Sequence, residues 1–235
     1  AHAYRSIAFH ELYVDRDPSA AIESAFAPIK AFAGDSPRDA FFLGEIARCH
    51  WIRAIYALRH DHDATTHIEA ARNAAQTIVS VRNTMTLATR ILLARIELEN
   101  LWNALRARNK SSVDENAAID LVRPLIEQGA DETAPYEIMA EASALRAILE
   151  HNHDRDITIG LQMADKALGK NPNLVQAVAI KGLLYLVEAK HASKAPDSTE
   201  SMRKATEEFH TAAQRNKIVG IHYEYRRKAL LRFFE

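Results

Sequence analysis

Histidine and aspartate gather at two places in the sequence, and their side chains are the ones best suited to chemistry. The first group comprises His60, Asp61, His62, Asp63 and His67, and the second comprises His151, His153, Asp154 and Asp156. Imidazole nitrogens and carboxylate oxygens are ligands that zinc and other divalent ions accept. A metal-dependent hydrolase, in which such ligands converge on an ion that activates water, is one interpretation of these groups.

The context of the two groups favours a structural role instead. His62 and His67 lack the i, i+4 spacing that would place them on one face of a helix, and no cysteine accompanies them. A third tripeptide, Asp15-Arg16-Asp17, occupies the same kind of position with arginine in place of His62. We therefore expect loops in which an aspartate caps the following helix, with no bound metal and no other cofactor.

The pair His60-Asp61 is similar to the signature of metal-dependent His-Asp phosphohydrolases, another all-helical class. That chemistry requires several histidine and aspartate side chains around one metal pair. Here the pair falls in a join that recurs along the chain, which favours the structural interpretation.

The single cysteine is the other candidate for chemistry. Cys49 stands between Arg48 and His50, which could activate a thiol. It also lies in an apolar helical stretch, where cysteine commonly packs as a small hydrophobic residue, and we expect that role. With only one cysteine the chain forms no internal disulfide, which fits a reducing compartment. We therefore predict that this chain is not an enzyme.

Composition excludes several partners. The 30 basic and 31 acidic residues give a net charge of −1, so we expect no nucleic-acid partner. No apolar stretch approaches the roughly 20 residues that cross a bilayer, so we expect no membrane insertion. The sequence begins with Ala1 inside a helical pattern. We expect an excised piece of a longer protein, with a cytoplasmic location favoured over others.

Helical periodicity runs through the whole chain, and no stretch is convincing as a strand. Only seven glycines and seven prolines are present, which is few for a protein with many β-turns. Breaker segments, such as Gly34 to Pro37, separate the expected helices. These helices cover 1–15, 18–33, 38–60, 64–81, 85–109, 115–128, 134–152, 157–170, 174–192, 199–216 and 218–235.

The helices form pairs, and the pairs repeat. Aspartates expected to cap the second helix of each pair recur 41 to 51 residues apart, at Asp17, Asp63, Asp114, Asp156 and Asp197. Eight residues after each stands a small side chain: Ala25, Ala71, Val122, Ala164 and Ala205. The first helices carry their own recurring small residues, Ala47, Ala94, Ala140 and Gly182. Self-similarity at such a period is typical of a solenoid, in which each unit buries its apolar face against its neighbours.

One of these pairs resembles the tetratricopeptide repeat. The matching residues are Gly182-Leu183-Leu184-Tyr185, Ala205, Phe209 and Ala212, with Ala167, Asn171 and Pro172 at the end of the preceding unit. A tetratricopeptide unit is about 34 residues long, so these units are longer. Their long period resembles the helical tails that follow the kinase domain in some bacterial serine/threonine kinases. No kinase motif is present in the chain.

The resemblance implies an all-α fold, a right-handed superhelical stack of antiparallel helix pairs forming one domain over 1–235. The expected units are 1–35, 36–82, 84–129, 133–171 and 173–216, with a capping helix at 218–235. Basic side chains are expected to give that last helix a solvated outer face: Arg226, Arg227, Lys228 and Arg232.

It also implies where a ligand would bind, because the first helix of each pair lines the concave face of tetratricopeptide arrays. The positions expected to be exposed there are Phe41, Arg48, Trp51, Arg95, Leu98, Glu99, Glu137, Glu141, Gln176, Leu183 and Val187. Arg48 and Arg95 beside Trp51 could pair with carboxylates of an acidic peptide. The competing interpretation is that Phe41 and Trp51 pack on an adjacent helix and the arginines are only solvated.

The predicted function is a scaffold or regulatory module that binds a protein or peptide, within a larger signalling protein. The alternative is a structural or self-associating segment whose grooves are filled by its own chain. A metal-dependent hydrolase is the third interpretation.

Overall fold

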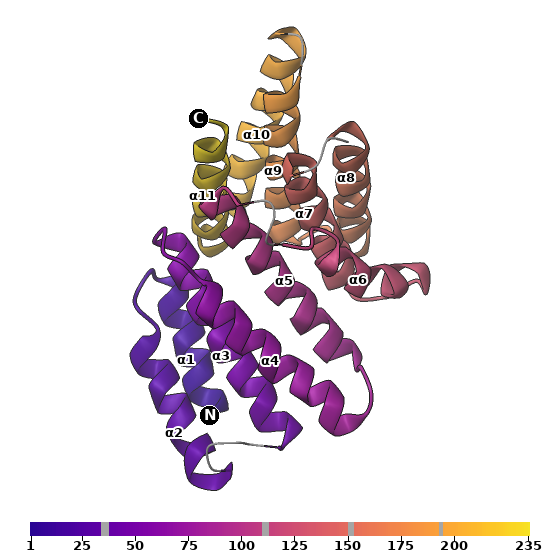
Figure 1. Ribbon diagram of the computed structural model, residues 1–235. Helices are drawn as coiled ribbons and strands as arrows, with labels where there is room; N and C mark the ends of the chain where they lie inside the picture. Colours follow the sequence, from indigo (N-terminus) through magenta and orange to yellow (C-terminus); the bar gives the residue numbers. More distant parts are fainter. Residues whose placement is uncertain (34–37, 110–112, 150–152, 193–194) are drawn as a thin grey trace. The chain divides into compact units, whose positions relative to one another are not determined.

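The computed structural model describes residues 1–33, 38–109, 113–149, 153–192 and 195–235, and within these ranges it contains helices and no strand (Figure 1). The helices are α1 (His2–Tyr13), α2 (Ser19–Ala33), α3 (Ala40–Arg59), α4 (Thr65–Arg82), α5 (Leu87–Ala107), α6 (Ala117–Glu127), α7 (Ala134–Leu149), α8 (His153–Lys170), α9 (Val175–His191), α10 (Ala195–Arg215) and α11 (Lys217–Phe234). The predicted all-α class is confirmed for the described residues. The breaker at 34–37 and His151 lie outside them.

The chain divides into two compact units, Ala1–Asn103 and Ala104–Glu235, and the boundary falls inside α5. In the N-terminal unit α1 packs on α2 and α3, and α3 packs on α4. In the C-terminal unit α7 packs on α6, α8 and α9, while α9 packs on α8, α10 and α11. Within each unit these consecutive helices are therefore neighbours in space, as expected for helix pairs joined by short connections.

Two of the Asp-X-Asp tripeptides have a clear conformational role. Asp15 and Asp61 have φ values of 59° and 60°, so each adopts the left-handed conformation that ends the preceding helix. Two residues later the carboxylates of Asp17 and Asp63 accept hydrogen bonds from the next helix, from the Ser19 N–H at 2.8 Å and the Thr65 N–H at 3.1 Å. The first aspartate stops one helix, and the second binds the first turn of the next.

The capping prediction is wrong for two later aspartates. Helix α8 begins at His153 and α10 at Ala195, so Asp156 and Asp197 lie inside the first turn rather than before it. The Asp156 side chain is buried and is bound to Arg146 of α7. A carboxylate that satisfies an arginine in this way does not serve as the cap of its own helix.

The recurring small residues of both helices are buried, and at Gly182 two helices approach closely. The five residues eight positions after the recurring aspartates are at most 2% exposed: Ala25, Ala71, Val122, Ala164 and Ala205. Ala47, Ala94 and Ala140 are fully buried. At Gly182 a Cβ atom would lie 3.1 Å from the Phe209 ring, so α9 and α10 approach each other too closely for a larger side chain.

The C-terminal end of each first helix contacts the join of the preceding pair. In the N-terminal unit Arg59 of α3 donates to the Leu12 carbonyl at the end of α1. Asn103 of α5 accepts from the Ala64 N–H at 3.2 Å and donates to the Thr65 hydroxyl at 3.0 Å, at the start of α4. These polar contacts tie consecutive pairs together.

The same contact recurs in the C-terminal unit with different chemistry. Arg146 of α7 donates to Asn116, just before α6, at 2.8 Å. The His191 ring of α9 stacks on the His153 ring of α8, with centroids 3.6 Å apart. Arg59, Asn103, Arg146 and His191 thus all lie toward the C-terminal end of a first helix and contact the join of the preceding pair, although their side chains differ.

Candidate functional site

Aromatic and cationic side chains meet on the first helices of the N-terminal unit. Trp51 of α3 makes an edge contact with Phe9 of α1, with ring centroids 5.7 Å apart. The Arg95 guanidinium of α5 lies over the Trp51 ring at 5.7 Å, and that of Arg5 lies over Phe9 at 6.0 Å. Both distances are within the range of cation–π attraction. Arg48 of α3 completes this set, which we call the cationic–aromatic face. It consists of Arg5, Phe9, Arg48, Trp51 and Arg95.

One buried carboxylate organises part of this face. Glu45 of α3 is 3% exposed and pairs with the Arg5 Nε at 2.8 Å and with the Arg48 guanidinium at 3.6 Å. Two guanidinium groups thus share one carboxylate. Burial lowers the pKa of Arg48, and the charge of Glu45 opposes that effect only in part. An additional anion beside Arg48 would stabilise its charged form.

Arg95 is the least compensated charge of the set. Among the residues that the structure describes, no carboxylate lies within ion-pair distance of it, and its guanidinium contacts the Trp51 ring. Arg95 and Trp51 are only partly buried. This arrangement holds a rigid aromatic ring and a guanidinium fork in place and leaves part of each accessible to a ligand.

The predicted site residues of the N-terminal unit differ in their surroundings. Arg95 lies over Trp51, and Arg48 is three residues before Trp51 on α3, whereas Phe41 is 56% exposed and its ring contacts Phe42. Leu98 and Glu99 are only 4% and 3% exposed, so the expectation that they are accessible is wrong. Helical periodicity did not reveal which turns of α5 face the core of its unit.

The C-terminal positions fit the predicted groove less well. Gln176 is exposed, and Glu137 is partly buried and accepts a hydrogen bond from Thr133 at 2.8 Å. Glu141, Leu183 and Val187 are buried, so their expected exposure is wrong. Leu183 and Val187 lie in the apolar core, where their transfer from water favours folding.

The chain's own last helix covers Glu141. The Arg226 guanidinium of α11 forms an ion pair with the Glu141 carboxylate, and the Tyr223 hydroxyl donates to it at 3.2 Å. Arg226 is 8% exposed, so its predicted solvated role is wrong. Burying a charged residue is costly unless it is paired, and the pairing explains why this part of the polar face turns inward.

Cys49 and the His/Asp groups, the other candidates for chemistry, lie in surroundings that favour a structural role. Burial raises the pKa of the Cys49 thiol to about 11, with a further contribution from Glu45, and the side chain packs with Ile22 and Ile52. The His60 ring contacts Tyr56, with centroids 4.3 Å apart. Within the described ranges no group of three or more His, Cys, Asp and Glu residues is arranged to hold a metal ion.

Sequence reasoning missed Arg5, Phe9 and Glu45. Arg5 and Phe9 are four residues apart, so they share one face of α1. That spacing was available as a signal, but only the packing of α1 on α3 shows that the pair faces Trp51.

Comparison of the chain with protein-family models, with curated proteins and with solved structures found no match. In the described part of the chain, no helix has the length and apolar character needed to cross a membrane.

Proposed function

We propose that this chain is a tetratricopeptide-like scaffold that binds an acidic segment of a partner protein on the cationic–aromatic face. In this proposal the helix pairs form a right-handed superhelix, and the first helices α1, α3 and α5 present the ligand side. The module would regulate or localise a larger signalling protein rather than catalyse a reaction.

The contact that carries the proposal is Arg95 over Trp51. A guanidinium held against an indole presents its N–H groups in a fixed direction, which suits the two oxygens of a carboxylate. Partly exposed tryptophan and arginine are also the residues that most often dominate protein interfaces. Arg48 and Arg5, which share Glu45, add positive charge on the adjacent helices.

The ligand is expected to be acidic and partly apolar. The face carries three arginines against the single carboxylate of Glu45, so an anionic peptide would complement it. Phe9 and Trp51 offer apolar surface between the charges. A peptide with two or three carboxylates and one aromatic or aliphatic side chain satisfies both features.

Selection from a random peptide display library on the immobilised chain tests this proposal. We expect enrichment of peptides rich in Asp and Glu, and loss of that enrichment on the chain carrying Arg48→Glu and Arg95→Glu. Selection of neutral or basic peptides, or of the same peptides on both chains, would refute the proposal. Circular dichroism establishes that the variant is folded.

A second candidate function rests on the contact of Arg226 and Tyr223 with Glu141. In the C-terminal unit this contact places the chain's own terminal helix on a position that a ligand would need. We propose that this unit has a structural role and that binding is confined to the N-terminal unit. Peptide binding by a chain that ends at residue 103 would support this division of roles.

A further inference from the structure

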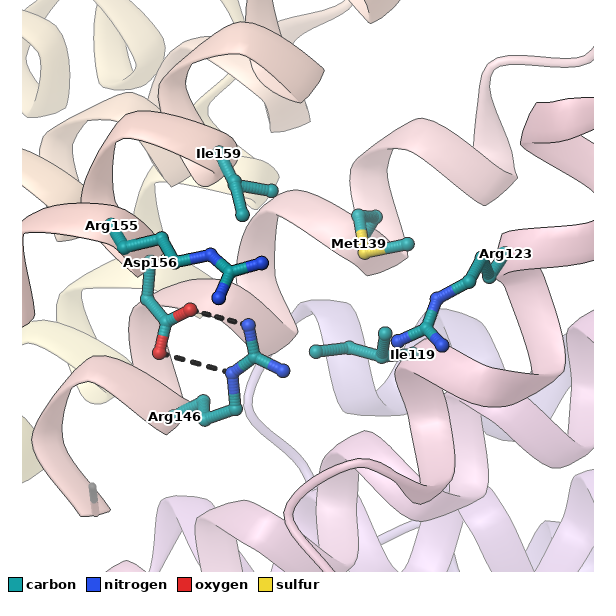
Figure 2. A pocket seen from close by; sticks show the side chains of 7 residues that line it. All are labelled: Ile119, Arg123, Met139, Arg146, Arg155, Asp156 and Ile159. Atoms are coloured by element: carbon teal, nitrogen blue, oxygen red, sulfur yellow. Dashed lines mark hydrogen bonds and ion pairs between the residues drawn. The ribbon is translucent and has the colours of Figure 1, made fainter. Parts of the chain in front are cut away.

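A pocket of about 390 Å³ opens between α6, α7 and α8 in the C-terminal unit (Figure 2). Its lining residues are Ile119, Arg123, Met139, Arg146, Arg155, Asp156 and Ile159. The volume lies within the range of about 300 to 1,000 Å³ that is usual for small-molecule sites. Neither the predicted site residues nor the proposed function uses this pocket.

The three arginines come from three different helices and point toward one space, as Figure 2 shows. Arg146 is held in place because its Nε donates to Asp156 at 3.0 Å and a terminal nitrogen donates to Asn116 at 2.8 Å. Asp156 is 2% exposed, so the pair forms a rigid wall. The pocket is therefore built on a fixed charged group.

The other two arginines have little internal compensation. Arg123 pairs with Asp120 at 3.2 Å, one turn away on the same helix, and both side chains are about half exposed. Such surface pairs hold their partners weakly. Arg155 makes no ion pair with any residue in the described ranges, and it lines the same pocket as Arg146 (Figure 2). Two guanidinium groups placed close together repel each other unless an anion lies between them.

We propose that this pocket binds a phosphomonoester whose carbon skeleton rests on the apolar side chains of Ile119, Met139 and Ile159. Inside the pocket the three guanidinium groups face only the Asp156 carboxylate, because Asp120 pairs with Arg123 at the exposed surface of α6. A phosphomonoester carries about −1.5 to −2 charges at pH 7 and has three acceptor oxygens, so it can accept hydrogen bonds from Arg155 and from Arg123, whose exposed pairing with Asp120 is weak. A single carboxylate group carries only one charge and has two acceptor oxygens, so it binds fewer guanidinium groups at once.

The same phosphate chemistry occurs on a free small molecule and on a phosphorylated side chain of a peptide. Isothermal titration calorimetry of the 235-residue chain with two probes distinguishes these sources: phenyl phosphate and a short phosphoserine peptide. Saturable binding of either probe is expected, and the tighter one identifies the source. Benzoate, which has the same ring and one negative charge, is expected to bind at least tenfold more weakly than phenyl phosphate.

Arg155→Gln is the sharpest variant, because it removes a partly free charge without disturbing the Arg146–Asp156 pair. We expect Arg155→Gln and Arg123→Gln each to weaken binding of the better probe by about tenfold or more. Arg82→Gln, an exposed position at the end of α4, is the matched control and should leave binding unchanged. The proposal is overturned if neither probe binds saturably, if benzoate binds as well as phenyl phosphate, or if Arg155→Gln binds like the wild-type chain.

Discussion

The Arg146 guanidinium binds the Asp156 carboxylate through two hydrogen bonds across the α7–α8 pair, one of them 3.0 Å from Nε to Oδ2. The sequence repeats the same ten-residue spacing at Arg53 and Asp63. There the outcome differs, because Arg53 pairs with Glu23 of α2 and Asp63 binds the start of α4. One sequence pattern thus supports two different sets of contacts.

Replacing Asp156 by alanine should cost about 3 kcal/mol or more of unfolding free energy. The change leaves the Arg146 guanidinium, only 15% exposed, without the carboxylate that it contacts. Removing one partner of a buried ion pair typically costs about 3 to 5 kcal/mol. Urea denaturation followed by circular dichroism measures the effect.

Asp63→Ala is the matched comparison, because Asp63 is exposed and its carboxylate binds the first turn of α4. Loss of such a contact typically costs about 1 kcal/mol. Equal losses for the two variants would show that Asp156 also acts only at the start of its helix.

Gly220→Ala should destabilise the C-terminal unit by about 1 to 3 kcal/mol. A Cβ atom there would lie 2.7 Å from the backbone of Ala213, so α10 and α11 would have to separate. Gly169→Ala places a Cβ in open space near the end of α8. This change should stabilise the C-terminal unit by up to about 1 kcal/mol. Thermal unfolding compares the two variants, and stabilisation by both would contradict the close approach of α10 and α11.

His50 should make the N-terminal unit less stable in acid. Burial lowers the pKa of His50 to about 4, and the positive charge of Arg53 adds to that effect. The folded state therefore binds fewer protons than the unfolded state, whose histidine has a pKa near 6.5. His50 therefore lowers the free energy of unfolding in acid. This destabilisation is absent above pH 6.5 and grows as the pH falls toward 4.

His50→Leu removes the titrating group. Between pH 7 and pH 5 the free energy of unfolding of the variant should therefore fall by about 1 to 2 kcal/mol less than that of the wild-type chain. Urea titrations at the two pH values give the difference. Equal losses in both proteins would show that His50 is protonated freely in the folded state.

Arg226→Ala should loosen the terminal helix. The change removes a cation from the Glu141 carboxylate, which is 4% exposed, and should cost about 3 kcal/mol. Limited proteolysis should then cut near the α10–α11 junction at lower protease concentration. Lys228→Ala is the control on the same helix, because its pairing with Glu224 is at the surface. If Arg226→Ala gives the same protease pattern as the control, the ion pair between Arg226 and Glu141 does not hold α11 in place.

Periodicity predicted the helices well, because small and apolar residues at helical spacing must be buried to stabilise a stack. Ala25 and Ala164 illustrate this, since both are fully buried at the predicted positions. Helix starts were harder to predict. Nothing local distinguishes Asp156 from Asp63, and only the Arg146 contact shows that the first is a core residue.

The residues of the candidate site could be named in part from the sequence. Arg95 of α5 lies over Trp51 of α3, two residues that the resemblance placed on successive first helices. Glu141 was expected in the groove because the resemblance implied that its position on the first helix of a pair is exposed. Its burial depends on Arg226, 85 residues later in the chain, and a pairing across that distance has no signature in a single sequence.

We propose that Arg48 and Arg95 bind an acidic peptide beside Trp51. It is tested most directly by titrating an acidic peptide, selected on the wild-type chain, against three folded proteins at two salt concentrations. These are the wild type, the double variant Arg48→Glu with Arg95→Glu, and a control with Arg16→Glu and Arg82→Glu. The control makes the same charge change at two exposed positions outside the cationic–aromatic face. We predict that the double variant binds at least about a hundredfold more weakly and that the control keeps most of its affinity. Equal affinities for the double variant and the control would contradict the account.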